Sequence, residues 1–176
     1  IGLAWLVGGV GILVTEQRRR GAQFTGKTLD ELTVRMALIV GGCQDGFNLI
    51  ARLLVSPGTP LVIENPCYQG AAYVFESFGA EPYPVTVDEH GMDVSQLPDV
   101  SSPVAYLTPS HQYPMGATLS LPRRMELLAW ADKHDAYILE DDYDSDFRFT
   151  GAPLTALKGL DRNDRVVYMG TFSKSM

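Results

Sequence analysis

The sequence predicts an α/β fold in three layers, in which a mostly parallel sheet carries helices on both faces. Two observations lead to this prediction. Short apolar runs of β type alternate with segments whose apolar residues recur at helical spacing, which is typical of successive strand–helix–strand units. Clusters of polar residues also follow several of these runs directly, and ligand-binding loops gather at the carboxyl ends of parallel strands in this way.

The individual elements can be predicted in order from residue 36. The apolar runs that we interpret as strands are Met36–Val40, Leu61–Ile63, Pro82–Val87, Val104–Leu107, Tyr137–Leu139 and Val166–Met169. Apolar residues at helical spacing predict helices around Phe47–Leu54, over Ala71–Phe78 and over Pro122–His134. Gly79 follows the second helix as a C-cap, and Pro122 stands near the first turn of the third.

Length and composition describe an ordinary globular domain. The chain has 176 residues, of which 45% are hydrophobic and 20% charged. Its net charge of −7 argues against nucleic-acid binding by this segment. Cys43 and Cys67 are too few and too far apart for a disulfide framework or a metal site, so we expect no metal. They fit a reducing, cytoplasmic compartment.

The first 35 residues form a segment whose status the sequence leaves open, and we divide the chain into residues 1–35 and a domain over 36–176. Ile1–Val14 is an apolar run, and Arg18–Arg20 follow it. The run is short of the roughly 20 apolar residues that span a bilayer, and a signal peptide would carry its positive charges before the run. We therefore expect no membrane insertion, and an arm packed on the domain is one interpretation.

Five polar clusters fall where predicted strands end, and we expect them to meet at one edge of the sheet. They are Gly41–Asp45, Asn65–Tyr68, Ser110–Tyr113, Glu140–Tyr143 and Thr171–Lys174. A lysine at a strand end, beside two hydroxyls, can form a Schiff base with an aldehyde cofactor whose phosphate the hydroxyls bind. The alternative for Lys174 is a surface lysine in a polar loop. Asp141 at a neighbouring strand end favours a site for pyridoxal phosphate.

These motifs together carry a family resemblance. Residues from about 36 to 176 resemble the large domain of fold-type I pyridoxal-phosphate enzymes, the class I/II aminotransferases. They are similar in particular to the aminotransferase-like domain of MocR-type regulators of the GntR family. The motifs are Gly-Gly-Cys-Gln, Glu-Asn-Pro-Cys-Tyr-Gln-Gly, Thr-Pro-Ser-His-Gln-Tyr-Pro-Met-Gly, Glu-Asp-Asp-Tyr-Asp-Ser-Asp-Phe-Arg and Gly-Thr-Phe-Ser-Lys-Ser.

The resemblance implies catalytic roles for three residues. Lys174 would form the internal aldimine with pyridoxal 5′-phosphate and later move a proton between the substrate Cα and the cofactor. Asp141 would pair with the pyridine nitrogen and keep it protonated, so that the ring withdraws electrons. Tyr143 would donate to the cofactor's phenolic oxygen; otherwise it is a tyrosine at the rim. Asp142 and Asp144 receive no catalytic role.

The resemblance also implies residues that bind the cofactor. Backbone N–H groups of Gly42, Cys43 and Gln44, at the start of a helix, would hold the phosphate, with Cys43 itself a small buried side chain. Thr171 and Ser173 would add hydroxyl contacts to that phosphate. Tyr68 would stack on the pyridine ring, with packing in the core as the alternative.

One position departs from the pattern of many aminotransferases. Tyr113 stands where many of them have an asparagine that donates to the cofactor's phenolic oxygen. His111 is a candidate for that polar role, although a lone histidine is more often structural. The sequence His-Gln-Tyr-Pro at this point is that of the MocR type.

Two functions follow from the resemblance. The first is an enzyme that transfers an amino group between an amino acid and a 2-oxo acid. The second is a sensor domain that binds the cofactor or an effector and controls an attached DNA-binding domain; a decayed gene fragment is a third possibility. A homodimer is implied. The family's phosphate-binding and substrate-binding arginines, expected beyond the lysine, do not occur before Met176. We therefore expect a fragment of a longer protein, poorly stable and weak or inactive alone.

Overall fold

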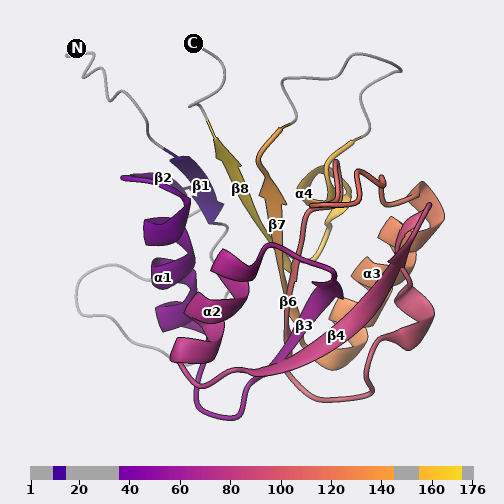
Figure 1. Ribbon diagram of the computed structural model, residues 1–176, viewed down its shortest axis with the longest axis horizontal. Coiled ribbons are helices and arrows are strands. Elements are labelled where there is room, and N and C mark those ends of the chain that lie inside the picture. The colour runs from indigo at the N-terminus through magenta and orange to yellow at the C-terminus, as the bar shows by residue number, and fades with distance from the viewer. Residues whose placement is uncertain (1–9, 15–35, 145–154, 172–176) are drawn as a thin grey trace.

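The computed structural model describes residues 10–14, 36–144 and 155–171 (Figure 1). Its strands are β1 (Val10–Val14), β2 (Met36–Val40), β3 (Pro60–Asn65), β4 (Glu81–Asp88), β5 (Gly91–Met92), β6 (Val104–Leu107), β7 (Tyr137–Asp142) and β8 (Val166–Thr171). Its helices are α1 (Cys43–Leu54), α2 (Gln69–Ser77), α3 (Leu121–His134) and the single turn α4 (Leu157–Leu160), with a 3-10 turn at Val94–Gln96. Each strand and helix predicted from the sequence is present, with ends shifted by a few residues.

The strands form one sheet in the order β2-β1-β8-β7-β6-β3-β4-β5. Strands β8, β7, β6, β3 and β4 are parallel to one another, whereas β1 is antiparallel to both β2 and β8, and β5 is antiparallel to β4. Since β2 and β8 both run opposite to β1, they point the same way. The carboxyl ends of β2, β3, β6, β7 and β8 therefore lie at one edge, as the sequence predicts.

Strand β1 comes from the N-terminal segment that we separated from the domain. Val10–Val14 pairs with Met36–Val40 on one side and, over Val10–Leu13, with β8 on the other. The described residues of this segment, Val10–Val14, therefore belong to the sheet. The division of the chain at residue 35 stays a prediction, because residues 1–9 and 15–35 lie outside the described part of the chain.

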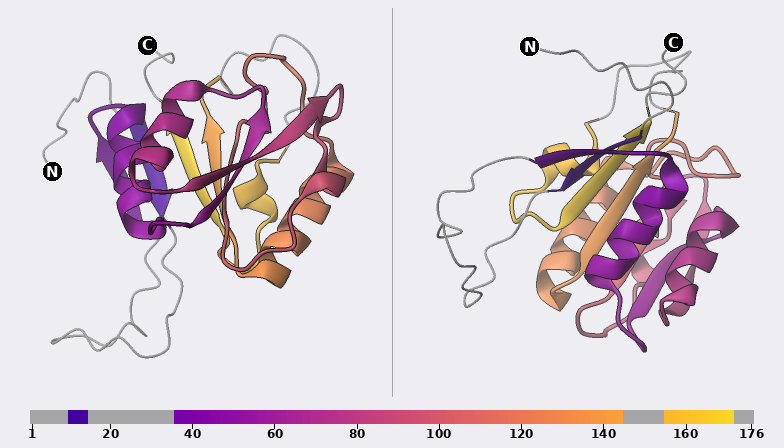
Figure 2. Two further views of the ribbon diagram at one scale, coloured as in Figure 1. Left: turned by 60° about the horizontal axis from the view of Figure 1, so that its bottom comes forward. Right: turned by 90° about the vertical axis from the view of Figure 1, so that its left-hand side faces the viewer.

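Helices cover both faces of the sheet, which confirms the three-layer prediction (Figure 2). Alternate residues of each strand point to opposite faces, and this period divides the core into two clusters. On one face, Phe47 of α1 and Phe75 of α2 pack against Leu139 and Met169. On the other face, Leu127 of α3 and its neighbours pack against strand residues that include Ala105, Leu107, Ile138 and Val166. Neighbouring residues of β7 consequently face different layers.

A buried arginine fastens α3 to the loops beside it. Arg124 is fully buried, and its guanidinium donates to the carbonyls of Leu119 (Nε, 2.8 Å), Thr155 (Nη1, 3.0 Å) and Pro109 (Nη2, 2.8 Å). Hydrogen bonds from a charged donor are stronger than neutral ones, and a buried charge needs such partners. This side chain therefore holds the loop that follows β6, which belongs to the edge where the polar clusters meet. In the described residues, none of the helices combines the length and apolar character needed to cross a bilayer.

We predict that Arg124→Met lowers the free energy of unfolding by about 3 kcal/mol, because the buried carbonyls of Leu119 and Pro109 and the part-buried carbonyl of Thr155 lose a charged donor. Urea unfolding of the full chain measures this change. Arg123→Met is the matched control: Arg123 bonds Asp88 at 2.6 and 2.7 Å near the surface, so its loss should cost about 1 kcal/mol or less. Equal losses in the two variants would contradict the role given to Arg124.

Candidate functional site

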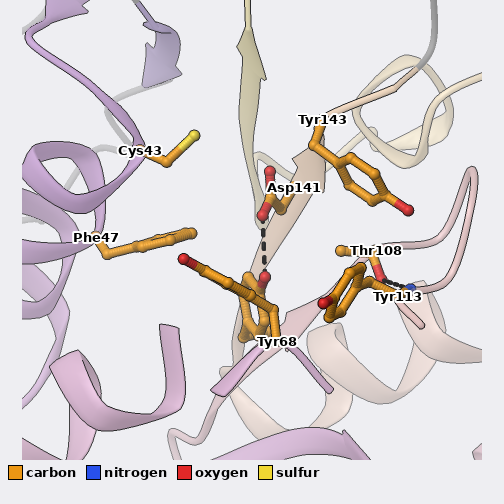
Figure 3. Close-up of a pocket in the computed structure, with 8 residues that line it drawn as sticks. Cys43, Phe47, Tyr68, Thr108, Tyr113, Asp141 and Tyr143 are labelled. Carbon is orange, nitrogen blue, oxygen red and sulfur yellow. Dashed lines mark hydrogen bonds between the residues drawn. The ribbon is translucent and has the colours of Figure 1, made fainter. Parts of the chain in front are cut away.

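A cavity of about 260 Å³ opens at the edge of the sheet where the polar clusters meet (Figure 3). Its lining comes from α1 (Cys43, Phe47), the start of α2 (Tyr68), strand β6 and the loop after it (Tyr106, Thr108, Tyr113) and the end of β7 (Asp141, Tyr143). Figure 3 shows Asp141 between the side chains of α1 and those of Tyr143 and Tyr113. The cavity thus collects residues from four of the five predicted clusters.

Asp141 is the buried carboxylate of the cavity. It is 6% exposed, and the hydroxyl of Tyr106 donates to its Oδ2 at 2.9 Å. Burial, and then the charge of Asp141, raise the pKa of Tyr106 well above its usual value, so this phenol keeps its proton and donates. A buried carboxylate needs such donors. The arrangement leaves a negative charge at the base of an aromatic-lined cavity.

The three successive carboxylates do not share one environment, because strand alternation puts Asp141 on one face of β7 and Glu140 and Asp142 on the other. Glu140 accepts hydrogen bonds from the backbone N–H groups of Leu157 and Lys158, both at 2.9 Å, on the α3 and α4 side. Asp142 accepts from the hydroxyl of Tyr168 at 2.7 Å. Within this acidic run, Asp141 is the carboxylate that lines the cavity.

Aromatic rings form most of the cavity wall. The rings of Tyr68 and Tyr113 meet edge to face with centroids 5.8 Å apart, and Tyr113 meets Tyr143 in the same way at 6.2 Å. Phe47 contacts the rings of Tyr68 at 6.4 Å and Tyr106 at 5.6 Å. Burial raises the pKa of Tyr143 to about 12, with further contributions from nearby carboxylates, so its phenol is protonated at neutral pH and can donate.

The other predicted site residues are placed around this cavity or beyond the described residues. Gly42 is the N-cap of α1, and Gln44 Nε2 lies 3.4 Å from the Tyr68 hydroxyl. His111 is outside the lining; its ring contacts Tyr143 at 6.1 Å and its Nδ1 lies 3.6 Å from Asp144. Thr171 ends β8. Ser173 and Lys174 lie outside the described residues. β8, the strand that precedes them, pairs with β7, Met169 lying opposite Asp141.

Several residues of the site were not predicted from the sequence. Phe47 and Tyr106 sit inside an apolar helix face and an apolar strand, where an aromatic residue predicts core packing. Thr108 follows β6, and two further buried polar side chains, Glu64 and Gln112, bond to it or to one another behind the cavity. Glu64 could have been identified from the sequence, because it is an acidic residue that directly follows the apolar run Leu61–Ile63.

This set of residues fits a flat, protonated heteroaromatic ring that bears an anionic group. The rings offer stacking and edge contacts, and Asp141 offers a buried acceptor for an N–H⁺. The N-terminus of α1, at Cys43, opens on the same cavity and carries the positive end of the helix dipole. The donor set and the charge arrangement are therefore those that a pyridinium ring with a phosphate requires.

We predict that Glu64 makes stability depend on pH. Burial raises its pKa from 4.5 to about 7. Between pH 4.5 and 7 the unfolded chain loses this proton while the folded chain keeps it, so stability falls over that range by about 3 kcal/mol and then levels off. Urea unfolding between pH 5 and 8 should show this fall in the wild type and not in Glu64→Gln. The exposed-site variant Glu89→Gln should keep it; an unchanged profile in Glu64→Gln would contradict the assignment.

Solved structures of aminotransferases share this fold. The kynurenine aminotransferase of Pyrococcus horikoshii, solved with PMP, superposes with a TM-score of 0.70 at 34% identity over 77% of this chain and 36% of that chain. The α-aminoadipate aminotransferase LysN of Thermus thermophilus, complexed with N-(5′-phosphopyridoxyl)-L-leucine, gives a TM-score of 0.69 at 32% identity over 76% of this chain and 36% of that chain.

Curated relatives include both regulators and enzymes. A probable rhizopine catabolism regulatory protein, MocR, of Rhizobium meliloti is 38% identical over 83% of this chain and 30% of its own length. Aromatic-amino-acid aminotransferase 1 of Thermococcus litoralis is 32% identical over 78% of this chain and 35% of its own length. The chain spans about a third of the length of these relatives. The family model for aminotransferase class I and II matches residues 12–176, and the chain therefore belongs to the class I and II aminotransferase family.

Proposed function

We propose that this chain is the cofactor-binding part of a protein that binds pyridoxal 5′-phosphate and transfers an amino group between an amino acid and a 2-oxo acid. The observation that carries the proposal is the buried carboxylate of Asp141, held by Tyr106 at 2.9 Å at the base of an aromatic-lined cavity. Family membership and the PMP and phosphopyridoxyl complexes of the similar structures support the same cofactor.

Asp141 would accept a hydrogen bond from the ring nitrogen of the cofactor and keep that nitrogen protonated. Its burial supports this role, because an ion pair is strengthened where water is excluded. When bound, the cofactor supplies an electron-withdrawing ring that stabilises negative charge developing at the amino acid Cα. Tyr106 orients the Asp141 carboxylate through the hydrogen bond that its hydroxyl donates to Oδ2.

The surrounding residues would orient the cofactor. Tyr143 would donate its phenolic proton to the cofactor's oxygen, which its raised pKa supports. Tyr68 would contact the ring face, and the start of α1, with the backbone of Gly42, Cys43 and Gln44, would bind the phosphate. Thr171 and Ser173 would add hydroxyl donors to that phosphate, and His111, beside Tyr143, is a further polar candidate.

Lys174 would bind the cofactor's aldehyde through its amine and then carry a proton to and from the substrate Cα. The support is sequence position: the lysine comes three residues after β8, the strand that pairs with the Asp141 strand. Asp142 and Asp144 have no role in this scheme. Residues 36–176 would form the cofactor-binding part, with β1 adding a strand from residues 1–35.

A sensor is the second candidate function. It is favoured by the 38% identity to the MocR regulator and by Tyr113, which lines the cavity at the position where many aminotransferases have an asparagine. In this case the cavity would bind the cofactor or an amino-acid adduct of it, and its occupancy would control an attached DNA-binding domain. This segment itself, at a net charge of −7, would not bind nucleic acid.

Three further features belong to the same proposal. A homodimer and a cytoplasmic location would accompany this function. This chain matches 30% of the length of the MocR regulator and 35% of the length of the aminotransferase, which supports its being part of a longer polypeptide. On that view the small-molecule partner is an amino acid or 2-oxo acid, and residues outside this chain would contribute to its selection.

We predict that the wild-type chain, mixed with pyridoxal phosphate, develops an absorbance band at longer wavelength than that of the free aldehyde and that Lys174→Ala abolishes this shifted band. The reason is that the shift requires a covalent imine between the lysine amine and the aldehyde. Lys133→Ala, at an exposed lysine of α3, is the matched control and should keep the band. A band that survives in Lys174→Ala, or is absent from folded wild type, would contradict the proposal.

The two candidate functions diverge once an amino acid is added to the loaded protein. An enzyme converts the bound cofactor to its amine form and releases a 2-oxo acid, which is detected directly in the solution. A sensor shifts the absorbance band without releasing a 2-oxo acid. The same wild-type sample therefore separates the two functions.

A further inference from the structure

A buried polar network lies behind the wall of the cavity and joins two of its loops. Its members are Glu64 at the end of β3, Thr108 after β6 and Gln112 four residues further, and they are 2%, 2% and 1% exposed. Of these, Thr108 lines the cavity. Burying three polar side chains together is costly unless each is hydrogen-bonded, so their arrangement is tightly specified.

Glu64 anchors the network. Its Oε2 accepts hydrogen bonds from the Thr108 backbone N–H at 3.1 Å, the Thr108 hydroxyl at 2.9 Å and Gln112 Nε2 at 3.3 Å. The Thr108 oxygen in turn accepts from the backbone N–H of Tyr113 at 3.0 Å. The Glu64 carboxyl group is therefore linked through the Thr108 hydroxyl to the backbone of Tyr113, whose ring forms part of the cavity wall.

Gln112 bridges the loop after β6 to the loop after β3. Its Nε2 also donates to the carbonyls of Pro66 at 2.8 Å and Tyr113 at 2.7 Å, and its Oε1 accepts from the Met115 N–H at 3.0 Å. Pro66 stands two residues before Tyr68. One buried amide thus holds together the backbones that carry the two facing rings.

The rings themselves are poorly fixed by packing. Tyr68 is 38% exposed and Tyr113 is 44% exposed, although the two rings meet at 5.8 Å and both line the cavity. Half-exposed side chains on loops take their position from the backbone that carries them. The network fastens that backbone, so it determines where the rings stand.

We propose that Glu64 and Gln112 are positioning residues for the cavity: they lock the loop at Thr108–Tyr113 against the loop at Pro66–Tyr68 and so set the spacing of the Tyr68 and Tyr113 rings. The locking of the two loops is a property of the fold and does not depend on which ligand binds. A consequence for ligand affinity rests on the proposed function, because the ligand is the cofactor named there.

The charge of Glu64 gives this network a pH response. Facing it are Asp141 on β7, Tyr106 on β6, Tyr143 after β7 and Cys67 after β3, of which the aspartate is negative and the others are ordinarily neutral. Among the described residues, Glu64 Oε1 has no hydrogen-bond partner and is open to a proton. The pKa of Glu64 lies at about 7, raised by burial. Above that pH the buried carboxylate is ionised at a desolvation cost that opening of the loop relieves, so the loop is held less firmly.

Hydrogen exchange and cofactor binding test the proposal on the full chain. Gln112→Met removes the bridge while keeping the side-chain length, and Glu64→Gln keeps an acceptor oxygen but cannot ionise. Gln96→Met is the control, since Gln96 bridges Thr86 and Asp93 in a similar way at 2.6 and 2.8 Å, among residues that do not line the cavity. Amide exchange of residues 108–116 and the affinity for pyridoxal phosphate are measured at pH 6 and 8.

We expect Gln112→Met to speed exchange at the Tyr113 and Met115 amides and to weaken cofactor binding by about tenfold, as the loss of a buried bridge implies. Wild-type protection of these amides, after correction for the intrinsic pH dependence of exchange, should fall from pH 6 to 8, and Glu64→Gln should lose that fall. Gln96→Met should change neither readout.

Unchanged exchange at these amides in both variants would overturn the proposal, and so would faster exchange with unaltered cofactor affinity. If Gln112→Met does not fold, the pH response of Glu64→Gln decides alone. A wild-type chain that fails to bind pyridoxal phosphate contradicts the proposed function instead, and exchange at the loop then still confirms or overturns the lock.

Discussion

The site depends on one constraint: a carboxylate can stay buried at the edge of this sheet only if neighbouring strands supply its donors. The hydrogen bond from Tyr106 to Asp141 meets that need, and both residues reach it because adjacent parallel strands are in register, with Tyr106 beside Leu139. Their side chains leave the sheet on the face covered by α1 and α2. The same face carries Phe47, and the start of α1 opens beside it. The cavity is therefore a product of strand register and helix placement.

Much of this arrangement is predictable from the sequence, because it rests on local patterns. The period of the apolar residues predicted the strands and helices from residue 36 onward, and polar residues after apolar runs predicted the edge at which Asp141, Tyr143 and Tyr68 gather. Strand β1 was harder, since Val10–Val14 lies inside a longer apolar run whose ends carry no turn signal. Its place between β2 and β8 depends on contacts distant in sequence.

The site residues that were not predicted from the sequence escaped prediction for the same physical reason. Tyr106 and Glu64 occur in or directly after apolar strands, and only the position of a neighbouring strand turns them from core positions into parts of a site. Gln112 belongs to the polar cluster Ser110–Tyr113, which was predicted to lie at this edge without a role for the amide. Its four hydrogen bonds involve groups up to 48 positions away. By contrast, Lys174 was singled out by sequence and lies outside the described residues. The cavity wall and its supporting network thus come from the structure, while the proposed covalent attachment comes from the sequence.

The protonation state of the bound cofactor's ring nitrogen tests the role of Asp141 most directly. Pyridoxal phosphate labelled with ¹⁵N in the ring, bound to the wild-type chain, should give the chemical shift of a protonated nitrogen, and this should persist at a pH where the free ring has lost its proton. Asp141→Ala should move the signal toward that of the neutral ring. A neutral ring nitrogen in the wild type, or an unchanged signal in Asp141→Ala, would contradict the account.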